Sequence, residues 1–222
     1  MPVADLTTGG TPSGRLMDGR VSRRPRERVA IAASAVVALF IGSAADGHMG
    51  TGLAGGFGSG FRHPLTGVDH LLAMVSVGLW GAFLGRPLIF ALPVIFPAVM
   101  VAGAVIGMLG VPLPPVEMGI AFSVVVLGGC IALSVKAPVW VASLIVAIFA
   151  IFHGYAHGRE LPSAADPVGY SLGFVVATGS LHVLGIGIGL LNHLPGGVRM
   201  TRGLGVLIAG AGVWFLYEAV AF

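Results

Sequence analysis

Long apolar runs separated by short breaks dominate the chain from residue 64 onward. Six of these runs are long enough for a helix to cross about 30 Å of hydrocarbon at about 1.5 Å per residue. They cover residues 64–84, 87–110, 116–135, 138–158, 168–191 and 203–222. Proline, glycine and charged residues mark the breaks between them. The pattern therefore predicts an all-α integral membrane protein, a bundle of six transmembrane helices.

The segment before this bundle follows a different pattern, in three parts. Residues 1–28 have no apolar periodicity and are rich in arginine, glycine and proline, which predicts a disordered basic tail. Residues 29–45 form a shorter apolar run that ends in small residues, as in a signal peptide, and we expect it to be cleaved. An uncleaved anchor is the alternative. Residues 46–62 are rich in glycine and predict an irregular linker outside the membrane, so the membrane domain is expected over 63–222.

The composition agrees with a membrane protein and excludes several other classes. Of the 222 residues, 56% are hydrophobic and 9% are charged, too few charges to cover a soluble domain. The arginines of residues 1–28 carry the whole formal net charge of +3, so a basic surface for nucleic acid is not expected in the folded part. The single cysteine, Cys130, excludes a disulfide framework. No GxxxxGK[ST] loop is present to bind a nucleotide.

The distribution of basic residues sets the expected orientation. The arginine tail is predicted to stay in the cytoplasm, which places the glycine-rich linker outside and sends the first span inward. The inner loops then receive Arg86, Lys136, Arg199 and Arg202, and the outer side receives Arg62 and Arg159. With six spans after the linker, the N-terminus of the cleaved chain and the C-terminus are both expected outside.

The first polar cluster, HPLTGVDH, stands at the start of the first span. On a single helix, His63 and His70 would lie about 20° apart around the axis and two turns from each other. Asp69 would lie on the flank of that face. Pro64 suits the first helical position, which would put His63 near the N-cap.

The second cluster, FHGYAHGRE, stands at the end of the fourth span. His153 and His157 are four residues apart and Glu160 follows three residues later, so all three share one side of a helix that persists to Glu160. Imidazoles with a carboxylate suit divalent ions such as nickel, zinc, copper or iron. Both clusters are expected at the outer membrane face, where they could converge on one metal site.

Other polar residues in the apolar chain have less specific interpretations. His182 stands alone in the fifth span, as a further ligand or as an interhelical hydrogen-bond partner. Six acidic residues map to the outer side, where they would attract cations, although a positive-inside bias alone would also leave acids there: Asp46, Asp69, Glu117, Glu160, Asp166 and Glu218.

The run HPLTGVDHLLAMVSVGLWGA, followed by FHGYAHGRE, resembles the two signature stretches of the HupE/UreJ family of bacterial nickel permeases. The resemblance extends from about His48 to the C-terminus and includes LPPVEMGIAFSVVVLG and ATGSLH. It implies a six-span inner-membrane protein, not an enzyme and without a permanent cofactor, that admits nickel or cobalt for hydrogenase or urease maturation. It also implies that one set of residues lines the metal path: His63, Asp69, His70, His153, His157 and Glu160.

The residues suggest a path and leave alternatives open. The ion would meet the outer histidines and then pass inward beyond His182, driven by its gradient and the membrane potential. A haem-binding electron-transfer protein also uses paired histidines, but carboxylates beside them favour a harder ion. A metalloprotease would need a glutamate where Gly154 stands. An accessory subunit of another metal transporter has the same sequence features, and the oligomeric state is not encoded in them.

Overall fold

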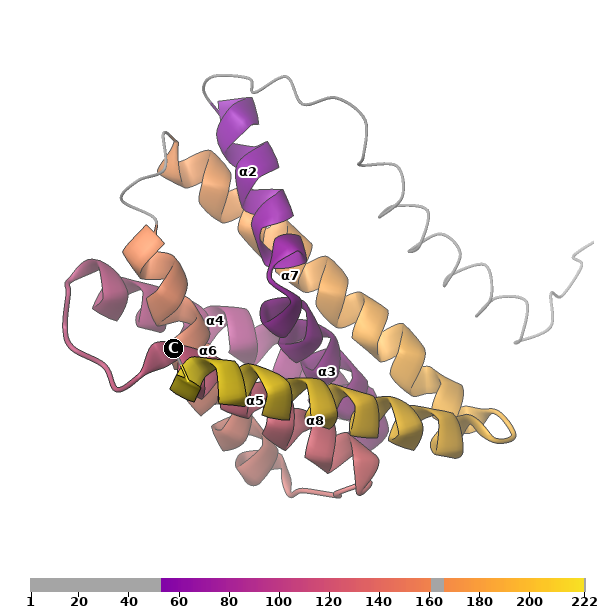
Figure 1. Ribbon diagram of the computed structural model, residues 1–222. Coiled ribbons are helices and arrows are strands. Elements are labelled where there is room, and N and C mark those ends of the chain that lie inside the picture. The colour runs from indigo at the N-terminus through magenta and orange to yellow at the C-terminus, as the bar shows by residue number, and fades with distance from the viewer. Residues whose placement is uncertain (1–52, 161–165, 222) are drawn as a thin grey trace, which may run out of the picture.

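A computed structural model describes residues 53–160 and 166–221, and within them the chain contains α-helices, one 3-10 turn and no strand (Figure 1). The helices are α2 (Leu53–Thr66), α3 (Val68–Leu84), α4 (Leu88–Met108), α5 (Val116–Ala132), α6 (Val139–Glu160), α7 (Pro167–Leu190) and α8 (Gly197–Ala221), with the 3-10 turn η2 (Leu191–His193) before α8. The predicted all-α class is confirmed. The basic tail, the signal segment and His48 lie outside the described residues.

Not every predicted span is long enough to cross a bilayer alone. Four helices of the described part, α4, α6, α7 and α8, have the length and apolar character of a membrane span. The apolar helix α5 has 17 residues. α2 and α3 pass the same test only as a pair, which is bent by 83°. The described chain is therefore a multi-pass membrane protein with up to five spans by this measure, and the predicted count of six is not confirmed.

The start of the first span differs most from the prediction. α2 begins at Leu53, so the described end of the predicted linker is helical and Pro64 lies inside this helix. The chain breaks at Gly67, whose extended backbone separates α2 from α3. Glycine-rich sequence is typical of linkers, but in α2 glycine permits close helix packing. A Cβ at Gly60 would collide with the carbonyl of Tyr170 in α7, so only glycine allows the two helices to approach this closely.

The helices pack in pairs at glycine contacts. α2 and α3 both lie along α7, α4 packs on α6, and α5 packs on α8 (Figure 1). A Cβ at Gly78 of α3 would collide with the carbonyl of His182 in α7, and one at Gly185 with the carbonyl of Val75. Small residues matter here because lipid tails are as apolar as the side chains, so close van der Waals packing must hold the helices together.

α3 is the central helix. Ten consecutive residues, Ala73–Ala82, are buried, so protein surrounds this helix on all sides. Its Trp80 donates a hydrogen bond from Nε1 to the carbonyl of Val135, at 3.1 Å. By contrast, α4, α7 and α8 each expose large apolar side chains, such as Phe90, Leu172 and Leu207, on the surface that faces lipid. The first residues of α3, Val68 to Leu72, are exposed or half-buried, so the buried part of this helix begins about one turn after Asp69 and His70.

Candidate metal centre

Four histidines from the two sequence clusters meet at one end of the bundle. His70 of α3 contacts both histidines of α6, with ring centroids 5.0 Å from His153 and 4.8 Å from His157. The His157 ring lies 4.9 Å from that of His63 in α2. We call these four residues the histidine row. Residues about 90 positions apart in the sequence are thus in direct contact.

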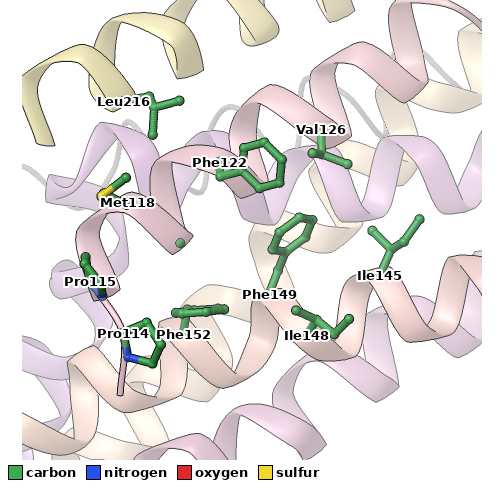
Figure 2. Close-up of a pocket in the computed structure, with 11 residues that line it drawn as sticks. Pro114, Pro115, Met118, Phe122, Val126, Ile145, Ile148, Phe149, Phe152 and Leu216 are labelled. Atoms are coloured by element: carbon green, nitrogen blue, oxygen red, sulfur yellow. The ribbon is translucent and has the colours of Figure 1, made fainter. Parts of the chain in front are cut away.

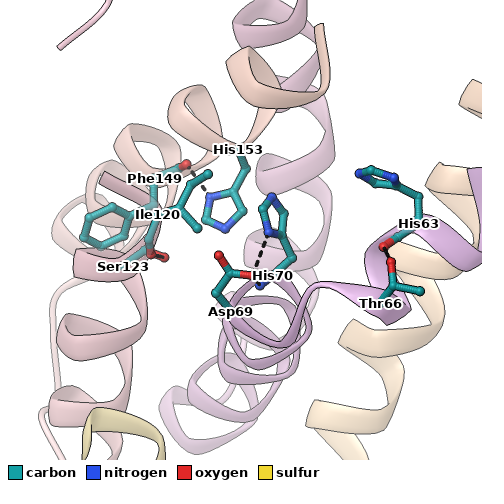
Figure 3. A network of polar contacts seen from close by, with 8 residues as sticks. All are labelled: His63, Thr66, Asp69, His70, Ile120, Ser123, Phe149 and His153. Atoms are coloured by element: carbon teal, nitrogen blue, oxygen red, sulfur yellow. Dashed lines mark hydrogen bonds and ion pairs between the residues drawn. The ribbon is translucent and has the colours of Figure 1, made fainter. Parts of the chain in front are cut away.

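The break at Gly67 determines how the first cluster takes part. His63 is in the last turn of α2 rather than at an N-cap, and its carbonyl accepts a hydrogen bond from the Thr66 hydroxyl at 2.8 Å. His63 and His70 therefore lie on two helices at a steep angle, and the expectation that they share one helix face is wrong. Figure 3 shows His63 across the break from His70. Both nevertheless contact His157.

Asp69 orients His70. Its Oδ1 accepts the backbone N–H of His70 at 2.8 Å and lies 3.1 Å from Nδ1 of the same residue (Figure 3). A carboxylate beside Nδ1 favours the tautomer with the proton there, which leaves the lone pair on Nε2. The Nε2 atom of His70 is buried and has no hydrogen-bond partner among the described residues. Asp69 thus supports a potential ligand atom on its neighbour.

His153 is oriented in the same way by a backbone carbonyl. Its Nδ1 lies 2.8 Å from the carbonyl oxygen of Phe149, to which it donates (Figure 3). The ring is fully buried, and its Nε2 has no hydrogen-bond partner within the described chain. α3 and α6 thus each present an imidazole whose Nδ1 is engaged and whose Nε2 is open, on two rings that touch.

The glycines of the second cluster hold α6 in place. A Cβ at Gly154 would collide with the carbonyl of Met100, and a Cβ at Gly158 with that of Ala104. Each glycine follows a histidine, so close packing of α6 on α4 fixes the direction of the histidine beside it. α6 does persist to Glu160, as predicted, although the Glu160 side chain lies outside what the structure describes.

His182 lies apart from the row, with Phe96 between. The Phe96 ring of α4 is 5.3 Å from the His153 ring and 5.5 Å from the His182 ring. His182 is 1% exposed, so it is enclosed within the bundle. Among the described residues, His182 makes no ring contact with the histidine row, and the Phe96 ring contacts both His182 and His153.

The histidines contact one another in pairs. Over residues 53–160 and 166–221, no group of three or more His, Cys, Asp or Glu side chains is close enough to hold a metal ion together. The predicted metal site therefore remains a prediction. What the structure provides is a row of imidazoles, two of them with open Nε2 atoms, along which an ion could pass between pairs of ligands.

Aromatic residues of α7 that the sequence did not single out complete this end. Phe174 lies 4.3 Å from the His157 ring, and Tyr170 lies 5.7 Å from the His63 ring. A cavity of about 90 Å³ beside His157 is lined by both aromatic residues and by Ser171. Nothing in their spacing distinguishes them from other aromatic residues in spans, and the same holds for Phe96.

A second hollow is entirely apolar. A groove of about 620 Å³ between α5, α6 and α8 is lined by residues such as Met118, Phe122, Phe149, Phe152 and Leu216 (Figure 2). None of the labelled side chains in Figure 2 carries a charge or an imidazole. The groove offers no nitrogen or carboxylate ligand, so the histidine row is the better candidate for metal chemistry.

Known proteins resemble this chain over both histidine clusters. The family described as HupE / UreJ protein matches residues 29–215. Protein HupE of Rhizobium leguminosarum bv. viciae is 43% identical over 181 residues, which are 82% of this chain and 94% of that protein. No solved structure matches the chain.

Proposed function

This chain belongs to the HupE/UreJ family, and on that basis we propose that it is a permease for a divalent transition metal in the bacterial inner membrane. Nickel is the proposed substrate, with cobalt as the related alternative, and the metal would supply hydrogenase or urease maturation. The observation that carries the proposal is the contact of His70 with His153 and His157, which joins two distant clusters at one place.

The chemistry of the row suits a borderline ion. Neutral imidazole nitrogen binds nickel, cobalt and zinc well, whereas magnesium and calcium prefer oxygen. The open Nε2 atoms of His70 and His153 are buried, where an unpaired polar atom is costly unless a ligand compensates for it. A path of imidazole pairs would replace part of the water shell without closing a full, tight site that would trap the ion.

The energy for uptake comes from outside the protein. The membrane potential favours inward movement of a divalent cation by about 4–5 kcal/mol per 100 mV. In the proposed path, the ion enters between α2, α3 and α6. It exchanges one imidazole ligand for the next along the histidine row and then continues toward His182. Asp69 acts through His70 in this scheme, and Phe174 and Tyr170 shield the entrance.

The test is nickel entry into liposomes that contain only the purified full chain. His70→Ala and His153→Ala should each reduce the initial rate about tenfold or more, since each removes an oriented nitrogen ligand. His193→Ala is the matched control, because this exposed histidine lies in η2, beyond the end of α7.

Two results would contradict the proposal. Unchanged uptake in both buried-histidine variants, at equal protein incorporation, would rule out the histidine row as the path. Absence of uptake by the lone chain, with uptake restored by cell membranes, would instead indicate an accessory subunit.

A further inference from the structure

The Phe96 ring contacts both His153 and His182. Its side chain is fully buried, and its ring meets the two imidazoles nearly edge-on, at interplanar angles of 69° and 83°. Among the described residues, these two histidines share no ring contact of their own. An ion that leaves the histidine row toward His182 therefore meets an apolar ring.

The backbone around Phe96 is weakened by its flanking prolines. Pro93 and Pro97 both lie inside α4. Proline has no N–H, so Pro97 leaves the carbonyl of Pro93 without its helical donor, and Pro93 does the same to the carbonyl of Ile89. Two hydrogen bonds of the helix are thus missing in the two turns that end at Pro97, next to Phe96, which makes this part of α4 easier to bend than the rest.

α7 carries a second set of buried polar groups, of which His182 contacts the Phe96 ring. Thr178 and His182 are one helical turn apart and almost fully buried. The Thr178 hydroxyl has no hydrogen-bond partner in the described chain, whereas the exposed Ser171 and Ser180 of the same helix donate to carbonyls four residues earlier. Both ring nitrogens of His182 are also buried without a hydrogen-bond partner among the described residues. We call the site at His182 the inner station.

We propose that Phe96 is a gate between the histidine row and the inner station, and that bending of α4 at Pro93 and Pro97 moves it aside. The closed ring excludes water and hydrated ions from the space between His153 and His182. Mg²⁺ keeps its waters and prefers oxygen, so a closed aromatic ring stops it, while an ion held by imidazoles can wait at the row until the gate opens. The identity of the ion in this inference rests on the proposed function, whereas the contacts of Phe96 with the two histidines do not depend on it.

Cysteine accessibility tests the gate without any metal. In a Cys130→Ser background, His182→Cys reports the inner station and Arg62→Cys, an exposed position in α2, marks the side of the histidine row. A membrane-impermeant methanethiosulfonate is added from that side to the full chain in liposomes. With Phe96 present we expect slow modification of His182→Cys. With Phe96→Ala we expect a rate at least about tenfold higher, since the space left by the ring borders the imidazole of His153 and can hold water.

Two further variants separate loss of the Phe96 ring from a general effect of removing an aromatic side chain or of misfolding. Phe90→Ala removes an aromatic side chain from the same helix where it is 59% exposed, and it should leave the rate unchanged. Phe96→Leu retains apolar bulk and should give an intermediate rate, and it replaces the alanine variant if that one does not fold. A rate that Phe96→Ala and Phe96→Leu both leave unchanged would overturn the gate.

Ion selectivity gives the second measurement. In liposomes where the unmodified chain admits nickel, Phe96→Ala should raise Mg²⁺ entry about tenfold or more, because a hydrated ion can then pass without imidazole ligands. Phe90→Ala should not change it. Increased cysteine modification in a chain that transports no metal would refute the proposed function and leave the gate standing. Nickel uptake with unchanged modification and unchanged Mg²⁺ entry would refute the gate alone.

Discussion

The two open Nε2 atoms are the most specific chemical feature of the molecule. His70 and His153 each have the Nδ1 atom engaged by an oxygen, of a carboxylate in one case and of a backbone carbonyl in the other. An imidazole whose tautomer is already fixed by such a contact binds a metal with little reorganisation. At the residue scale, the support for a metal path is therefore the orientation of the imidazoles as much as their number.

Asp69 should behave as a positioning residue. Asp69→Ala removes the acceptor for His70 Nδ1 and should reduce nickel uptake about 10–100-fold, the usual cost of losing such a partner. Asp69→Asn keeps an acceptor oxygen and should retain uptake within about tenfold of the unmodified chain. The measurement is the initial uptake rate over a range of nickel concentrations. Equal losses in the two variants would instead make the carboxylate a direct ligand.

The sequence predicts the ligand types but not their arrangement. Imidazoles and carboxylates stand out in an apolar chain, so both clusters are visible without a structure. The role of Phe96 is not visible, because a phenylalanine in a span is ordinary until two histidines are found against its ring. The orientation of His70 by the adjacent Asp69 was also missed, because sequence spacing gives only the helix face.

At the scale of elements, close packing of α6 on α4 brings the second cluster to the first. The glycines after His153 and His157 leave room for the carbonyls of α4, so the helices approach more closely than side chains would allow. The break at Gly67 adds His63 to this cluster. It turns α2 away from the axis of α3, so His63 contacts His157 from a different direction than His70 does.

Gly154→Ala should therefore destabilise the bundle. The added Cβ meets the Met100 carbonyl, a backbone atom that cannot rotate away, and overpacking of this kind costs about 1–3 kcal/mol. Gly210→Ala in α8 is the matched control, because a Cβ there meets nothing within 4 Å, and it should be neutral or stabilising by about 0.5–1 kcal/mol. Thermal unfolding of the purified protein in detergent compares the two. Equal midpoints would show that the α4–α6 contact can relax.

The sequence predicts most helix bounds within a few residues, and the exceptions have local causes. The predicted 87–110 corresponds to α4 at Leu88–Met108, and 168–191 to α7 at Pro167–Leu190. α5 ends before its predicted limit of residue 135, because Ser134 adopts a positive φ of 54°. α2 was missed altogether, since glycine-rich sequence is typical of linkers and its stability here comes from packing on α7.

At the scale of the whole molecule, charge is divided between the two ends of the bundle. Asp69, Glu117 and Asp166 lie in or next to the first turns of α3, α5 and α7, where carboxylates also stabilise the helix dipole. Arg202 lies near the start of α8, at the other end, where it donates to the carbonyl of Ala132 at the end of α5, at 2.8 Å. The histidine row is at the acidic end, which would concentrate cations at its entrance.

This polarity leads to a prediction about orientation in the membrane. The positive-inside rule places the basic end in the cytoplasm, so the acidic end with the histidine row should face the periplasm. In a Cys130→Ser background, a membrane-impermeant thiol reagent should label Arg62→Cys and Glu218→Cys in intact spheroplasts. Arg86→Cys, which is exposed between α3 and α4, should be labelled only after permeabilisation.

The result also bears on the order in which an ion meets the histidines. If Arg86→Cys is labelled in intact spheroplasts and Arg62→Cys is not, the histidine row opens to the cytoplasm. The membrane potential would still draw cations inward, but they would meet His182 first and leave through the histidine row, so the row would be the exit of the path and not its entrance. Labelling of Arg62→Cys and Glu218→Cys from opposite sides would show that the bent pair α2–α3, or the short helix α5, does not cross the bilayer in the way the charge pattern requires.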